Sequence, residues 1–159
     1  MPVPCDSHPQ DRRDDDRPAP EHRRPDGVSD EAVAAVGKLA EAVETIERAR
    51  GHLYAFHQMT GYADEMLDEV VEGLRGIGRD DLADRIATEL IGLNVVAGRW
   101  SFQVVEEYDD GYYRTTLDLD RVVRDELVGG RRHLMEAEMK EQRRTRGRPG
   151  HDARPHERD

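Results

Sequence analysis

A stripe of side chains that repeats every three or four residues between Ala32 and His57 constrains the fold of this chain most strongly. That spacing places one side of an α-helix against a partner for almost four heptads, so it predicts a long helix over residues 30–60. Ser29, which two acidic residues follow, is suited to cap the start of this helix. Gly61 is expected to kink or end it. The stripe consists of Ala32, Val36, Leu39, Val43, Ile46, Arg50, Leu53 and His57.

Further helical patterns follow along the chain. Residues 62–76 are two-sided, with an apolar face opposite an acidic face. Shorter helices are expected near residues 80–93, over 118–128 and over 131–145. With short loops, the first three helices would form the nucleus of a small antiparallel helical bundle. In residues 62–76 the apolar face holds Ala63, Met66, Leu67, Val70, Val71 and Leu74, and the acidic face holds Glu65, Asp68, Glu69 and Glu72.

Residues 95–120 fit two alternatives. Alternating large side chains on either side of an Asp-Gly pair fit a β-hairpin near residues 100–118. We expect a helix instead, because an isolated hairpin would need another strand or a surface to pack on. The helical stripe, which Asp109 and Thr116 interrupt, would contain Phe102, Val105, Tyr112, Leu119 and Val123.

The two ends of the chain have few apolar residues. Residues 1–27 contain six of the eight prolines and one large aliphatic side chain. They are predicted to be a disordered tail, because they could not bury enough apolar surface to offset the entropy of ordering. Residues 146–159 are predicted to be a second, basic disordered tail. A single, mainly α-helical domain is therefore expected over residues 28–145.

The composition excludes several classes of protein. The chain has 35 acidic and 24 basic residues and a formal charge of −11, which opposes binding to nucleic-acid phosphates. No apolar run approaches the roughly 18–20 residues that span a bilayer, and no signal peptide is recognised, so we expect a cytoplasmic protein away from membranes. Cys5 is the single cysteine, which excludes an internal disulfide and a cysteine-based zinc site.

Two polar residues, Arg50 and His57, occupy positions in the stripe where apolar residues are expected. Burying either one without a partner would be costly, so acidic side chains should face them. This predicts a polar pocket in which His57 is a ligand or a general base. The alternative is that the stripe rolls around the helix and leaves both residues at a solvated edge. The candidate acids are Glu89, Glu106 and Glu107, together with Asp109 and Glu126.

Other catalytic patterns have little support in the sequence. Neither His57 nor His133 has the Glu three residues earlier that di-iron helical bundles use, so no metal and no cofactor are expected. The acidic face of residues 62–76 loosely resembles the carboxylates that hold magnesium in all-α nucleotide pyrophosphohydrolases, but its acids are spaced differently, and a solvated helix face explains it without any ligand. No motif for a nucleophile or a phosphate loop is present. The sequence therefore favours a non-enzymatic role.

Five of the eight aromatic residues lie within fourteen positions of the chain. Tyr, Trp and Phe are enriched at protein interfaces, so this segment predicts a contact surface for a protein partner or a second copy of the chain. The alternative is that these residues form a packing wedge inside the helical domain. The candidate interface residues are Trp100, Phe102, Tyr108, Tyr112 and Tyr113.

A short basic motif near the C-terminus resembles a DNA-binding peptide. Arg146, Gly147, Arg148 and Pro149 match the core of AT-hook peptides, a resemblance that implies arginines inserted into the minor groove of A·T-rich DNA. Because the body of the chain is acidic, we do not expect a nucleic-acid partner.

Three longer stretches carry a broader resemblance. The region from about Ser29 to Pro149 resembles small uncharacterised helical proteins of high-GC actinobacteria. The stretches that carry it are RARGHLYAFHQMTGYAD, GRWSFQVVEEYDDGYY and DELVGGRRHLMEAEMKE. This resemblance implies a lineage but no activity.

Overall fold

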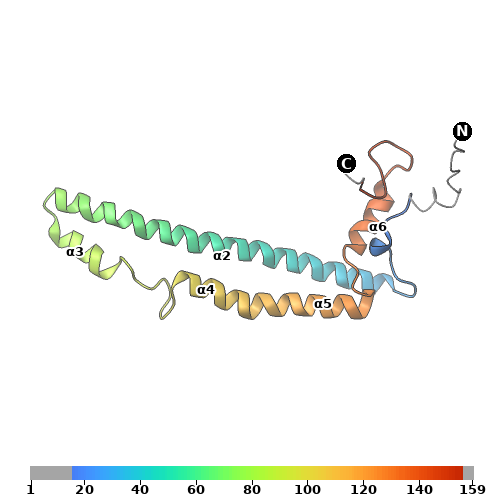
Figure 1. Cartoon of the computed structure of the whole chain (residues 1–159), viewed down its shortest axis with the longest axis horizontal. Helices are drawn as coiled ribbons and strands as arrows, with labels where there is room; N and C mark the ends of the chain where they lie inside the picture. Colours follow the sequence, from blue (N-terminus) through green and yellow to red (C-terminus); the bar gives the residue numbers. More distant parts are fainter. Residues whose placement is uncertain (1–15, 156–159) are drawn as a thin grey trace, which may run out of the picture. The chain divides into compact units, whose positions relative to one another are not determined.

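A computed structural model describes residues 16–155, and in this range the chain forms helices and no β-strand (Figure 1). The prediction of a mainly α-helical protein is confirmed. The chain divides into two compact units, one comprising Met1–Ala42 and Asp118–Asp159 and the other Val43–Leu117. The elements are η1 (Pro20–His22), α2 (Asp30–Gly76), α3 (Asp80–Glu89), α4 (Ser101–Tyr108), η2 (Asp109–Tyr113), α5 (Arg114–Val128) and α6 (Leu134–Arg143).

Helix α2 is continuous through Gly61, so the predicted kink or end at this residue was wrong. The two helices expected over residues 30–60 and 62–76 are one helix, and the predicted nucleus of three helices does not form. The reason is that the heptad spacing continues beyond His57 and keeps one side of the helix covered, while a helical glycine costs only about 1 kcal/mol. The stripe continues through partly or fully buried positions at Thr60, Asp64, Leu67, Val71 and Leu74.

In the unit Val43–Leu117, two elements pack on α2. Helix α3 folds back along the end of α2, where Val71 and Ala83 are buried (Figure 1). Helix α4 runs antiparallel to the middle of α2, as the pairing of Arg50 with Asp109 and of His57 with Ser101 shows.

The π-helical turn η2 between α4 and α5 changes which residues face inward. A π-turn adds one residue to a helical turn and so shifts the phase of the side chains that follow. Tyr113 at its end and Thr116 after it are partly buried, whereas Tyr112 and Leu119 are 60% and 57% exposed. The helical stripe predicted for this segment is confirmed at Val105 and Val123, which are covered, and was wrong at Phe102, Tyr112 and Leu119, which are exposed. Asp109, which interrupts the predicted stripe, turns inward to pair with α2. The alternative of a hairpin near residues 100–118 is also wrong, since this segment is helical from Ser101 onward.

The other unit has a small apolar core. Val33 and Val36 of α2 pack there with Val128 of α5 and Leu134 of α6. The predicted break at Gly129-Gly130 is confirmed, and both glycines adopt positive φ angles, of 62° and 73°. These left-handed conformations, which glycine tolerates, turn the chain from α5 into α6.

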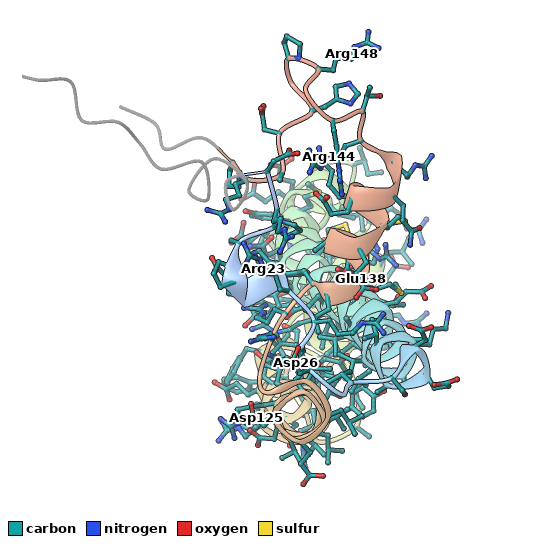
Figure 2. The ribbon with its side chains drawn as sticks, turned by 90° about the vertical axis from the view of Figure 1, so that its right-hand side faces the viewer. Arg23, Asp26, Asp125, Glu138, Arg144 and Arg148 are labelled. Carbon is teal, nitrogen blue, oxygen red and sulfur yellow. The ribbon has the colours of Figure 1, made fainter. Side chains whose placement is uncertain are left out.

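The N-terminal segment, residues 16–27, contacts α6 (Figure 2). Arg24 donates two hydrogen bonds of 2.7 Å to the carboxylate of Glu138. The side chain of Arg144 is 1% exposed and pairs with Asp16 at 2.6 Å. The predicted tail of residues 1–27 thus includes a structured part, because Arg24 pairs with Glu138 and Asp16 pairs with Arg144. Residues 1–15 of that tail lie outside the described residues.

Candidate functional site

The middle of the α2 stripe is polar, and each polar side chain there has a hydrogen-bonding partner. We call Arg50, His57, Thr60 and Asp64 the polar seam. They lie on one side of α2, at consecutive stripe positions apart from Leu53. Each is partly buried, so an unpaired polar group would be destabilising.

Arg50 is held by an acid and two aromatic rings. Its Nε and Nη2 atoms donate hydrogen bonds of 2.7 and 2.8 Å to the two carboxylate oxygens of Asp109. Its guanidinium carbon lies 4.9 Å from the ring centre of Tyr54 and 4.7 Å from that of Tyr113, distances typical of cation–π contacts. The guanidinium group of Arg50 is therefore surrounded by a carboxylate and two aromatic rings.

The same contacts change the pKa values of the cluster. The hydrogen bonds from Arg50 lower the pKa of Asp109, and a hydrogen bond from the Tyr54 hydroxyl to Oδ2 at 3.1 Å adds to this effect. The Tyr113 hydroxyl donates to Glu47, which raises the pKa of Tyr113. Because both oxygens of Asp109 already accept hydrogen bonds within the chain, the cluster is suited to fixing the alignment of α4 on α2.

A second polar contact lies two turns along α2. His57 Nδ1 is 2.8 Å from Ser101 Oγ at the start of α4, and Asp64 accepts a hydrogen bond of 3.1 Å from the Gly92 amide. Beside them is a pocket of about 310 Å³. Its lining includes Thr60, Asp64, Leu93, Val95, Trp100 and Ser101.

Three of the five acids that the sequence proposed, Glu89, Glu106 and Glu107, do not pair with Arg50 or His57, and a fourth, Glu126, is exposed. Glu89 pairs with Arg85 on α3 at 2.9 Å. Glu107 pairs with Arg99, and Glu106 is exposed. Asp109, which the sequence also named among the acids that could face the stripe, is the residue that pairs with Arg50.

The predicted interface residues separate into two groups. Trp100 and Phe102 are 59% and 39% exposed, and their rings meet edge-on with centres 5.4 Å apart. Tyr112 is also exposed, whereas Tyr108 and Tyr113 are partly buried. The structure therefore leaves Trp100, Phe102 and Tyr112 available for contact and uses Tyr113 in the Arg50 cluster.

Sequence reasoning missed several residues at both places. Tyr54 lies four residues after Arg50 on α2, a spacing that brings side chains together on a helix and could have indicated the contact. Leu93 and Val95 line the same pocket as Trp100, and Val96 forms a backbone bridge with Arg99, the residue before Trp100. The exposed fractions of the three are 64%, 37% and 49%. Val95 and Val96 were signalled only by a short apolar run without helical periodicity. Leu93 was expected at the end of the helix near residues 80–93, but α3 ends at Glu89.

Two further expectations can be compared with the described residues. Among residues 16–155, no group of three or more His, Cys, Asp or Glu side chains is placed to hold a metal ion. No helix in this part of the chain has the length and apolar character needed to cross a membrane.

The AT-hook-like motif lies in a compact turn. Gly147 has a φ of 76°, and Arg146 lies 3.7 Å from Glu141. The Thr145 amide donates to His151 Nδ1 at 3.0 Å. Residues 146–155, expected to belong to a disordered tail, thus have contacts of their own, and residues 156–159 lie outside the described range.

Comparison with known proteins adds no relative. No protein-family model matches this chain, and neither a curated protein nor a solved structure matches it.

Proposed function

We propose that this chain is a helical protein-interaction module of the cytoplasm that works by binding another protein, without catalysis. The observation that supports it most is a cluster of large apolar side chains that stay exposed around the start of α4. We call this cluster the Trp100 surface. It consists of Leu93, Val95, Val96, Trp100 and Phe102.

The Trp100 surface has the character of an interface rather than of a core. Trp100 and Leu93 expose more than half of their surface, although folding normally covers such side chains. The ion pair between Arg99 and Glu107 stands beside the aromatic pair and supplies a polar rim. In protein interfaces, a few aromatic residues enclosed by a polar rim commonly provide most of the binding energy.

The test compares capture of partner proteins by the immobilised full chain and by Trp100→Ala. The proposal expects at least one protein from the native cell extract to bind the wild type and to be lost with Trp100→Ala. Met139→Ala serves as the matched control, because Met139 is also a large exposed apolar residue but lies on α6. Identical capture by all three chains would refute the proposal.

Fluorescence gives an independent readout of the same surface. Trp100 is the only tryptophan, so its emission reports this site alone. Once the captured protein's own emission is subtracted, its addition should shift the Trp100 emission to shorter wavelength as water leaves the indole. An unchanged spectrum on a saturated complex would exclude Trp100 from the contact.

A second candidate function rests on the pocket beside Ser101. The hydrogen bond between Ser101 and His57 resembles the pairing that activates a serine nucleophile, and the pocket next to it could accept a small apolar ester. Hydrolysis of p-nitrophenyl acetate by the purified chain, lost in Ser101→Ala but retained in Ser29→Ala, would support this function. Equal rates for all three chains would exclude it.

A further inference from the structure

An apolar stripe stays exposed along the second half of α2 and at Ile77, the residue that follows this helix. We call it the uncovered stripe. Its residues alternate at spacings of three and four, the same heptad pattern as the covered stripe. The stripe consists of Phe56, Met59, Ala63, Met66, Val70, Gly73 and Ile77, of which Met59, Met66 and Ile77 are 62%, 64% and 74% exposed.

The surroundings of α2 explain why this stripe stays open. At about 100° per residue, the side chains of residues 56–77 fall into three sectors. The polar seam and its apolar continuation fill one sector, against α3 and α4. The acidic face around Asp68 fills another. The uncovered stripe fills the third, so the apolar face predicted for residues 62–76 is only partly covered, with Val71 buried and Met66 exposed.

The uncovered stripe is separate from the Trp100 surface. Trp100 shares a pocket with Gly61. Gly61 and Met66 point about 140° apart around α2. A partner on the Trp100 surface would therefore leave the uncovered stripe free.

We propose that the uncovered stripe is the surface on which a second copy of this chain packs, with the two α2 helices antiparallel. Antiparallel helices with heptad stripes pair their residues in layers. One register of this stripe against itself pairs its first six residues and combines a larger with a smaller side chain in each layer, which lets the helices approach closely. The layers are Phe56 with Gly73, Met59 with Val70, and Met66 with Ala63, each occurring twice by symmetry.

Residues at the edge of the paired stripes also complement one another between the two copies. In the same register Tyr62 of one chain falls beside Glu69 of the other. Both side chains are exposed in the single chain. A tyrosine hydroxyl can donate a hydrogen bond to a carboxylate, so the pair would close the rim of the interface on both sides.

The charge of the unit predicts how salt should affect the pairing. Val43–Leu117 has 15 acidic and 7 basic residues, a formal charge of −8, yet the stripe itself contains no charged residue. Two copies therefore repel one another at long range and attract only along the apolar stripe. Because salt screens the repulsion, the dimer should become tighter as ionic strength rises. A basic partner would show the opposite dependence.

The first test is sedimentation equilibrium of the full chain in low and high salt. The proposal expects the mass to rise toward twice 18.1 kDa with concentration, and to do so at lower concentration in high salt. Met66→Glu should weaken the association at least tenfold. Gln58→Glu, which adds the same charge at an exposed position outside the stripe, should change it by less than threefold. Trp100→Ala should leave it unchanged.

The second test determines the orientation of the helices with a short bismaleimide cross-linker in a Cys5→Ser background. The antiparallel register expects a cross-linked dimer when Phe56→Cys and Gly73→Cys chains are mixed, and little product from either chain alone. A cysteine at position 73 has room, because no atom lies within 4 Å of a Cβ placed there. Product from each variant alone would show a parallel pair and overturn the proposed register.

Two outcomes would overturn the dimer itself. One is a mass of 18.1 kDa at all concentrations in high salt. The other is equal association of Met66→Glu and Gln58→Glu. Helical circular dichroism of each variant verifies that its fold is intact. Loss of the dimer would leave the proposed role of the Trp100 surface standing, because partner capture there does not depend on this stripe.

Discussion

The variant Gly61→Ala tests whether α2 is one helix. Gly61 lies inside the helix, is exposed, and has no atom within 4 Å of the position where a Cβ would stand. Alanine therefore adds no clash and gains the helix propensity that glycine lacks. The free energy of unfolding should rise by about 0.8–1.0 kcal/mol. For a chain of this length that corresponds to about 2–4 °C in Tm.

Gly78 provides the matched control. It also has open space around its Cβ position, but its φ of 75° is left-handed. Alanine should therefore lower stability there, by about 1–2 kcal/mol. The two variants make the same chemical change in open surroundings, so the sign of the effect reports the backbone conformation alone.

Urea unfolding followed by circular dichroism at 222 nm measures both variants. At an unchanged slope, the midpoint should rise for Gly61→Ala and fall for Gly78→Ala. A fall for Gly61→Ala of the size seen for Gly78→Ala would show that the helix ends or bends at residue 61. That result would refute a continuous α2 and the uncovered stripe that depends on it.

Three further predictions concern the cores and the ion pairs. Val128→Ala should cost about 2–3 kcal/mol in urea unfolding, because Val128 is fully buried and its loss leaves a cavity; a cost below about 0.5 kcal/mol would contradict this core. The pKa of Asp109 is lower in the folded chain than in the unfolded one, so its stabilisation is full above pH ~4 and disappears as the pH falls. Tm measured from pH 6 to pH 2 should therefore fall more steeply for the wild type than for Asp109→Asn, and parallel curves would contradict the pairing with Arg50. Arg24→Ala should lower Tm by releasing the N-terminal segment from Glu138, whereas an unchanged Tm would mean that this contact contributes nothing.

The heptad spacing predicted a helix over residues 30–60 and the side of this helix that other elements cover. Val36 and Ile46 can be assigned to that side from their positions alone. In the structure Val36 is buried, and Ile46 is partly buried between two exposed residues. The break at Gly129-Gly130 was equally local, because two consecutive glycines favour a left-handed turn wherever they occur. Local sequence is therefore sufficient to predict the structure where the backbone preference of a few residues, or the burial of one helix face, determines it.

Gly61 shows where local rules fail. Its intrinsic cost of about 1 kcal/mol is smaller than the gain from keeping the stripe on one side of the helix, and that gain comes from residues distant in sequence. Periodicity likewise favoured an inward position for Tyr112, which lies in η2. The π-turn reverses this, because Asp109 must reach Arg50 on another helix.

The sequence by itself determined that the chain is helical, that α2 is long, and that Arg50 and His57 interrupt its covered stripe. These properties depend on residues within a few turns of one another. Only the tertiary structure decided that Asp109 pairs with Arg50, that Ser101 meets His57, and which half of the apolar face of α2 stays open. Those outcomes depend on which helix packs on which side of α2. That packing is determined by the apolar burial and the charge pairing of segments that are far apart in the chain.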